Sequence, residues 1–171
     1  MKNAKLSYHQ DFPQTPVSGW AGVRRYAWVN QQNDSGQWKR PKHKYVYPFE
    51  KQRKLWCLLE IHFQGVDLIF ALPAELDQFI EIMSQNPLPS GNRLIKGRKL
   101  GRPNNHWLSR LPKKTKPWAF RQKLCKYLET APQASEFREF YTSHPVRLKF
   151  DGYYDSFYDA IRAQKMHTST P

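Results

Sequence analysis

Two stretches of alternating apolar and polar residues around Gln64-Gly65 constrain the fold of this chain more than any other feature. An alternation of period two is typical of a strand with one buried face. A two-residue turn at Gln64-Gly65 would place the apolar residues of the two stretches opposite one another. The expected cross-strand pairs are Phe63 with Val66, Ile61 with Leu68, Leu59 with Phe70 and Cys57 with Leu72. We therefore predict an antiparallel hairpin with one continuous apolar face.

An amphipathic helix is expected directly after this hairpin. Pro73 suits the first turn of a helix, and an apolar stripe at helical spacing follows it, formed by Leu76, Phe79, Ile80 and Met83. The helix should end by Asn86, because the residue before a proline disfavours helical geometry. The stripe would cover the apolar face of the hairpin. The fold class that follows is α+β, a small antiparallel sheet packed by an amphipathic helix.

The rest of the chain divides by composition into further segments. We expect an irregular N-terminal arm over residues 1–19, a sheet-plus-helix region over 20–86, a basic loop over 87–116 and a mainly helical part over 117–171. Within these, strands are expected at 22–30, 44–49 and 146–150, a turn at 31–39, and helices at 117–130, 135–142 and 153–164. Because 171 residues suit one domain, residues 20–171 are expected to be compact together.

The charge of the chain is strongly unbalanced. It contains 28 Lys and Arg against 14 Asp and Glu, a formal net charge of +14. Between Glu81 and Glu129 there is no acidic residue, and this segment holds the cations Arg93, Lys96, Arg98, Lys99, Arg102, Arg110, Lys113, Lys114, Lys116, Arg121, Lys123 and Lys126. An uninterrupted run of one sign repels itself until a polyanion neutralises it and releases counterions. We therefore predict that this segment binds DNA or RNA.

Within this segment, the helix expected from Pro117 separates charge from apolar residues. Lys116, Lys123 and Lys126 fall on one side of the helix, and Phe120, Leu124, Tyr127 and Leu128 fall on the other. Arg121 lies near the apolar stripe. Its side chain either runs along the helix to reach water or forms a planar fork for phosphate.

Aromatic side chains are interspersed among the cations. Trp107 and Trp118 lie in the basic segment, and Trp28 follows Arg24 and Arg25. Binders of single strands and of RNA use such rings as stacking platforms for bases. The alternative is that the same rings belong to the core, where aromatic residues also dominate.

Two short stretches resemble DNA-binding families. Gly101-Arg102-Pro103 resembles the centre of an AT-hook, which implies that Arg102 enters an A·T minor groove, although Asn104 and Asn105 stand where the family has basic residues. Gly22-Val23-Arg24-Arg25, followed by strands and a helix, resembles the DNA-reading sheet of AP2-type domains. That resemblance implies major-groove contacts from Arg24 and Trp28. The stretch 31–53 is longer here than in that module, and the helix expected after Pro73 lacks its alanine-rich face.

Candidates for catalysis are few. His62 and Asp67 should face each other across the hairpin, with Glu60 on the same strand, which suits either a general base or a cross-strand ion pair. His106 lies among the cations, where it would contact phosphate or act as a general acid in metal-independent RNA cleavage. The chain shows no paired metal-ligand spacing and no nucleotide-binding glycine motif, so no metal or cofactor is expected.

Together these features favour one function and leave two alternatives. We expect a nucleic-acid-binding protein without evident catalysis; the alternatives are a nuclease or RNA-processing enzyme, metal-independent or Mg-dependent, and a subunit of a larger nucleoprotein complex. No stretch approaches the roughly 18 to 20 apolar residues of a membrane span, and no secretory signal is apparent, so a cytoplasmic protein with no membrane partner is expected. DNA versus RNA and the oligomeric state stay open.

Overall fold

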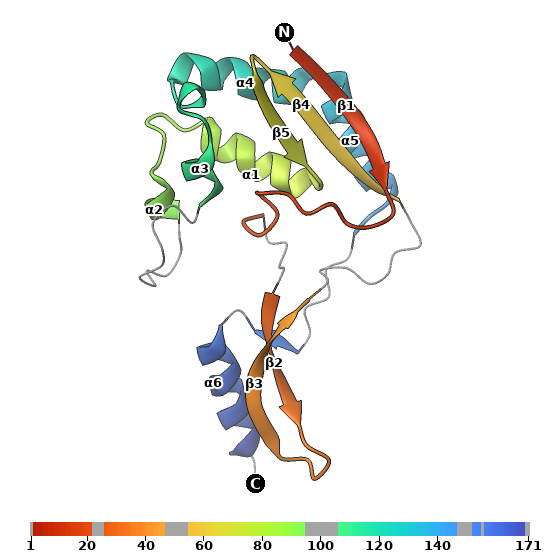
Figure 1. The fold of residues 1–171 in the computed structure, drawn as a ribbon, viewed down its shortest axis with the longest axis vertical. Coiled ribbons are helices and arrows are strands. Elements are labelled where there is room, and N and C mark those ends of the chain that lie inside the picture. Colours follow the sequence, from red (N-terminus) through yellow and green to blue (C-terminus); the bar gives the residue numbers. More distant parts are fainter. Residues whose placement is uncertain are drawn as a thin grey trace. The chain divides into compact units, whose positions relative to one another are not determined.

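The structure, a computed structural model, divides the chain into two compact units. It describes residues 2–21, 26–46, 55–94, 106–146, 152–154 and 156–169. Unit 1 contains Met1–Gly22 and Arg53–Pro145, and unit 2 contains Val23–Gln52 and Val146–Pro171. The α+β class is confirmed, and the boundary between the two units falls within the range 20–171 that was expected to be compact together. Unit 2 joins two segments far apart in the sequence, and such non-local pairing leaves no mark in local periodicity (Figure 1).

The predicted hairpin forms the centre of unit 1. Strands β4 (Trp56–Phe63) and β5 (Val66–Phe70) pair in the expected register, with Phe63 opposite Val66 and Leu59 opposite Phe70. The turn has positive φ at both central residues, 49° at Gln64 and 74° at Gly65, as a type I′ hairpin turn requires.

The predicted pair of Cys57 with Leu72 is not formed. β5 ends at Phe70, and the chain turns there into the helix, so the backbone of Cys57 needs another partner. Tyr141 supplies it, because its hydroxyl accepts from the Cys57 N–H at 3.2 Å and lies within hydrogen-bond distance of the carbonyl oxygens of Ala71 and Cys57, at 2.7 Å and 3.0 Å.

The N-terminus is a strand rather than the irregular arm expected over 1–19. Strand β1 (Lys2–His9) pairs antiparallel with the whole of β4, from Lys2 opposite Phe63 to His9 opposite Trp56. The sheet order is β1-β4-β5. An edge strand with a polar outer face shows little apolar periodicity, which explains why the sequence did not reveal it; the breakers Pro13 and Pro16 come only after it.

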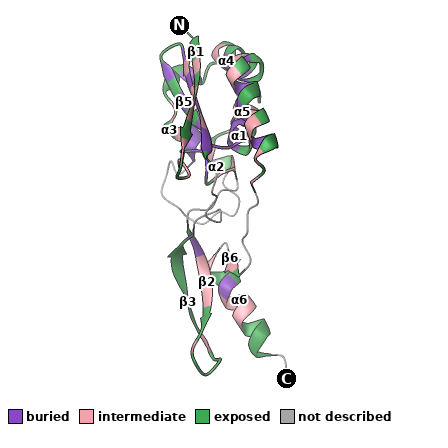
Figure 2. Cartoon of the chain, turned by 90° about the vertical axis from the view of Figure 1, so that its right-hand side faces the viewer, coloured by how far each residue is buried: buried purple, intermediate pink, exposed green. Residues whose placement is uncertain are grey.

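Helices cover one face of the unit 1 sheet. They are α1 (Pro73–Met83), α4 (Trp118–Thr130) and α5 (Pro132–Ser143), and the first two lie close to the predicted ranges. Figure 2 shows them along one side of the sheet with buried residues between. The core includes Phe63, Phe70, Phe79 and Phe137, each at most 1% exposed.

The expected loop over 87–116 instead contains three short elements: α2 (Gly91–Leu94), α3 (Trp107–Arg110) and the 3₁₀ turn η1 (Lys113–Thr115).

Unit 2 is a three-stranded antiparallel sheet with one helix. Its strands are β2 (Tyr26–Gln32), β3 (Trp38–Tyr45) and β6 (Tyr153–Tyr154), in the order β3-β2-β6, and α6 (Phe157–Thr168) packs on them. β3 lies where a turn over 31–39 and a strand over 44–49 were expected, and β6 occupies the expected start of the last helix. Residues 47–50 and 147–150 lie outside the described residues.

The AP2-type resemblance assigned its helix to residues 74–86. That helix, α1, packs in unit 1. The helix that packs on β2 and β3 is α6, which begins more than a hundred residues after the end of β3. The order of elements that suggested the resemblance is therefore not the order in which they pack.

Candidate nucleic-acid interface

One face of the unit 2 sheet is covered by α6. The Trp28 ring centroid lies 5.1 Å from that of Phe157, and Asn30 Nδ2 lies 3.3 Å from the carbonyl oxygen of Ala160. On β3, Trp38 stacks on His167 at 5.2 Å. Because side chains alternate along a strand, Trp28 and Asn30 on this side place their neighbours on the opposite face.

The opposite face carries lysines. Ala27, Val29 and Gln31 of β2 pair with Lys44, Lys42 and Lys39 of β3, and paired residues share a face. The register shifts between Val29 and Gln31, so Lys39 shares the face of Lys42 although the two are three residues apart. We call Lys39, Lys42 and Lys44 the lysine face; all three are exposed. Val29 also pairs with Tyr153 of β6, so Lys42, Val29 and Tyr153 lie side by side across the sheet, and the Tyr153 side chain is half-buried.

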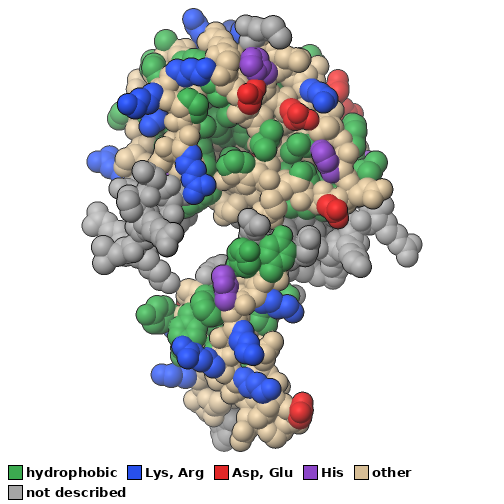
Figure 3. Space-filling view, in the orientation of Figure 1, with side chains coloured by type: hydrophobic (Ala, Val, Ile, Leu, Met, Phe, Trp, Pro, Cys, Tyr) green, Lys and Arg blue, Asp and Glu red, His purple; other side chains and the backbone are tan. Residues whose placement is uncertain are grey.

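The described part of unit 2 is more basic than that of unit 1. It contains six Lys and Arg against two Asp, an excess of four, whereas unit 1 has eleven Lys and Arg against nine Asp and Glu, an excess of two. In the view of Figure 3, Lys and Arg side chains gather over β2 and β3. A cluster of cations with few carboxylates near it attracts a polyanion.

The predicted base contacts around β2 are only partly described. Arg24 and Arg25 lie outside the described residues. Trp28 lies on the face covered by α6, between His43, at 5.1 Å, and Phe157, so its ring contributes to the packing of unit 2. Tyr153 was not among the predicted residues. Its only signal in the sequence is an aromatic residue beside a turn glycine, Gly152 (φ 79°).

The basic segment of unit 1 keeps several exposed cations in the described residues, and their role in binding stays a prediction. They are Arg93, Arg110, Lys113, Lys114, Lys116, Lys123 and Lys126. Lys114 is tied to the hairpin turn, because its Nζ donates to the carbonyl oxygen of Gly65 at 2.6 Å. Lys96, Arg98, Lys99 and Arg102, with the AT-hook-like stretch, lie outside the described residues.

His106 and Trp107 are buried, at 1% and 3% exposure. The His106 ring packs 4.3 Å from that of Trp20, and its Nδ1 accepts from the Leu108 N–H at 3.2 Å, capping α3. Burial lowers the pKa of His106 from 6.5, so the neutral ring is favoured. Trp107 stacks on Phe79 at 5.0 Å. In this structure neither ring has an open face for phosphate or a base, and the general-acid role predicted for His106 loses its geometric basis.

Arg121 fits neither of its sequence interpretations. It is 2% exposed, and its guanidinium donates to backbone carbonyl oxygens: Nη1 to Met83 at 2.7 Å and to Gln85 at 2.6 Å, and Nε to Lys116 at 2.8 Å. The guanidinium also lies 4.9 Å from the half-buried Trp118 ring. Arg121 thus satisfies carbonyls at the end of α1 instead of reaching water or phosphate.

The hairpin candidates for catalysis form surface interactions. His62 Nδ1 lies 2.7 Å from Asp67 Oδ1, the predicted cross-strand pair. Glu60 instead accepts from Ser7 Oγ at 2.8 Å, with Lys5 Nζ 3.9 Å away. Among the described residues, no group of three or more His, Cys, Asp or Glu is arranged to hold a metal ion. The geometry is that of cross-strand pairs on the open face of a sheet.

No helix in the described ranges is long and apolar enough to span a membrane. No protein-family model, curated protein or solved structure matches this chain.

Proposed function

We propose that this protein binds nucleic acid through the lysine face of unit 2. The observation that carries the proposal is the placement of Lys39, Lys42 and Lys44 on the sheet face opposite α6, where all three are exposed. Lys42 and Lys44 are two residues apart and so lie about 6.5 Å apart along the strand, and Lys39 precedes them across the register shift. A row of cations of this kind suits successive contacts with a polyanionic backbone. Such contacts supply affinity without reading sequence.

Tyr153 adds a preference for single strands. It lies across Val29 from Lys42, so a strand whose phosphate contacts Lys42 can stack a base on the ring. Stacking on an aromatic side chain contributes about 1–3 kcal/mol per base and needs an unpaired base. We therefore expect tighter binding to single strands than to duplexes of the same length.

The test is fluorescence anisotropy with labelled single- and double-stranded oligonucleotides over a series of salt concentrations. Replacing Lys39, Lys42 and Lys44 together by Gln should reduce the slope of log affinity against log salt by about 2 for single strands. The matched variant replaces Lys113, Lys123 and Lys126 of unit 1 by Gln, with the same loss of charge. A larger reduction of the slope in the matched variant would indicate that the binding surface lies in unit 1. No binding of any probe at about 50 mM salt would refute the function itself.

A further inference from the structure

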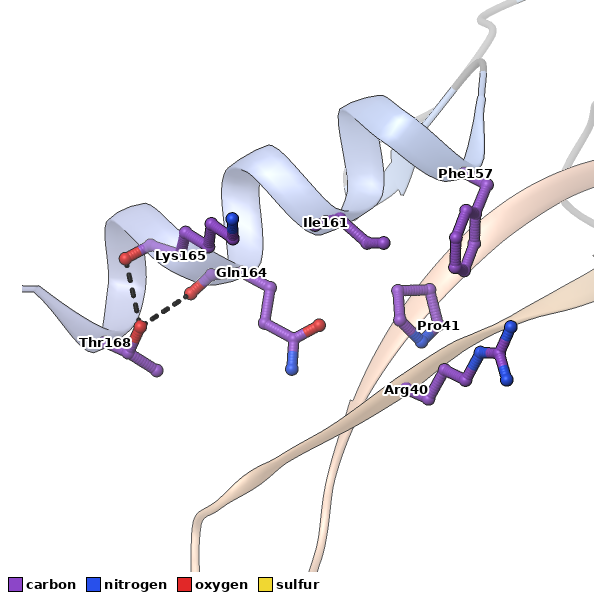
Figure 4. Close-up of a pocket in the computed structure, with 7 residues that line it drawn as sticks. All are labelled: Arg40, Pro41, Phe157, Ile161, Gln164, Lys165 and Thr168. Atoms are coloured by element: carbon purple, nitrogen blue, oxygen red, sulfur yellow. Dashed lines mark hydrogen bonds between the residues drawn. The ribbon is translucent and has the colours of Figure 1, made fainter.

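A groove of about 500 Å³ lies between β3 and α6 on the side of unit 2 away from the lysine face. Its apolar surface comes from Pro41, Phe157 and Ile161, which point toward one another in Figure 4. Gln164 lies beside them, and its Nε2 is 3.4 Å from the carbonyl oxygen of Trp38, which ties the helix to the strand. The groove is thus built by contacts between two elements rather than by one loop.

Two cations from different elements border this apolar surface. Arg40 comes from β3 and Lys165 from α6, and both are exposed. Within the described residues, neither forms an ion pair with a carboxylate. An apolar floor between two cations is complementary to an apolar side chain with a carboxylate on either side.

The packing of Phe157 favours a peptide over a nucleic-acid base in this groove. The Arg40 guanidinium lies 5.4 Å from the ring centroid, and the Trp28 ring is 5.1 Å away. Because the Phe157 ring already contacts Arg40 and Trp28, a base that entered the groove would meet the aliphatic surfaces of Pro41 and Ile161 instead of an aromatic ring. Aliphatic surfaces suit an apolar side chain, whereas base recognition relies on stacking.

We propose that this groove binds a short acidic segment of a partner protein, with one apolar side chain on Pro41 and Ile161 and flanking carboxylates paired with Arg40 and Lys165. The site does not depend on the lysine face, since the two lie on opposite faces of the sheet. It would therefore persist even if the chain bound no nucleic acid.

The probe is a labelled peptide in which one Leu is flanked by two Asp on each side, with a counterpart carrying Asn at the four Asp positions. Anisotropy should show binding of the acidic peptide to the full chain and much weaker binding of the Asn peptide. Lys165→Glu should weaken binding by about tenfold or more, because it opposes like charges. Arg162→Glu, the same charge change on α6 outside the groove lining, should weaken it less than about twofold.

Four outcomes of these binding measurements would overturn the proposal. They are absence of binding, equal binding of the Asn peptide, equal losses in Lys165→Glu and Arg162→Glu, and displacement of the peptide by a single-stranded oligonucleotide whose own binding depends on Lys165. The last would assign the groove to nucleic acid. A second measurement needs no variant: methyl NMR of the wild-type chain should show the Ile161 signal shifting on addition of the acidic peptide. An unshifted Ile161 signal during saturating binding would place the peptide elsewhere.

Discussion

The Arg121 guanidinium, on α4, donates a 2.7 Å hydrogen bond from Nη1 to the carbonyl oxygen of Met83, the last residue of α1. The same group also donates to Gln85 and Lys116, so one side chain joins the end of one helix to the start of another. Carbonyls at a helix end have no partner within the helix, and a buried one without a partner destabilises the fold.

Replacing Arg121 by Lys should lower the free energy of unfolding by about 2–3 kcal/mol. The ammonium keeps the charge but lacks the planar fork that reaches three carbonyls. Urea unfolding followed by circular dichroism measures the effect. Lys123→Gln, at an exposed position on the same helix, should change stability by less than about 0.5 kcal/mol. Equal stability of the two variants would contradict the role assigned to Arg121.

Replacing Tyr141 by Phe should cost about 1–3 kcal/mol, although only one oxygen is removed. The hydroxyl satisfies the N–H of Cys57 and the carbonyl oxygen of Ala71 where β5 has ended, and both groups are buried. Hydrogen exchange should locate the effect, because the Cys57 amide should lose protection while that of Leu59, within the paired part of β4, should lose much less. Unchanged protection at Cys57 would show that the hydroxyl is dispensable.

Glu75 predicts a decline in stability with rising pH. The carboxylate is buried and accepts hydrogen bonds from the hydroxyls of Thr15 and Ser18 and from the Ala71 N–H. Burial outweighs these bonds and raises its pKa above the ordinary 4.5. The folded state therefore holds the proton more tightly than the unfolded chain. This contribution is fully present below pH 4.5 and is lost as the pH rises through the folded-state pKa.

The comparison that isolates this effect is Glu75→Gln, because Gln does not titrate. The variant should lose about 1–3 kcal/mol of stability, since an amide nitrogen cannot accept from these donors. Its denaturant midpoint should also lack the wild-type decline as the pH rises above 4.5. A wild-type decline that persists unchanged in Glu75→Gln would assign it to another group.

His106 predicts the opposite slope. Burial lowers its pKa from 6.5, so the unfolded chain takes up a proton at a higher pH than the folded state does. Its contribution to stability is present above pH 6.5 and is lost as the pH falls through the folded-state value. His106→Asn keeps a capping acceptor for Leu108 but removes the contact with Trp20, which should cost about 1 kcal/mol at pH 8. The gap between the two proteins should narrow as the pH falls below 6.5; a constant gap would contradict the neutral buried ring.

The features that the sequence predicted well are those set by local periodicity. The hairpin at Gln64-Gly65 and the helices α1 and α4 follow from apolar spacing and from the preferences of Gly and Pro, because one strongly apolar face specifies register and boundaries. The strand β1 was missed for the converse reason. Its pattern is mostly polar, and it becomes a strand by pairing with β4 (Trp56–Phe63), which lies far along the chain.

The candidate site shows the same division. The excess of Lys and Arg is a property of composition, so the sequence shows it without any knowledge of the fold. The sequence by itself determined the hairpin, the main helices and the basic character of the chain. Only the tertiary structure decided that the exposed Lys39, Lys42 and Lys44 share a sheet face with Tyr153, and that His106, Trp107 and Arg121 are buried. The physical reason is that the direction and the burial of a side chain depend on residues distant in the sequence. Local patterns of charge and hydropathy do not show which distant residues those are.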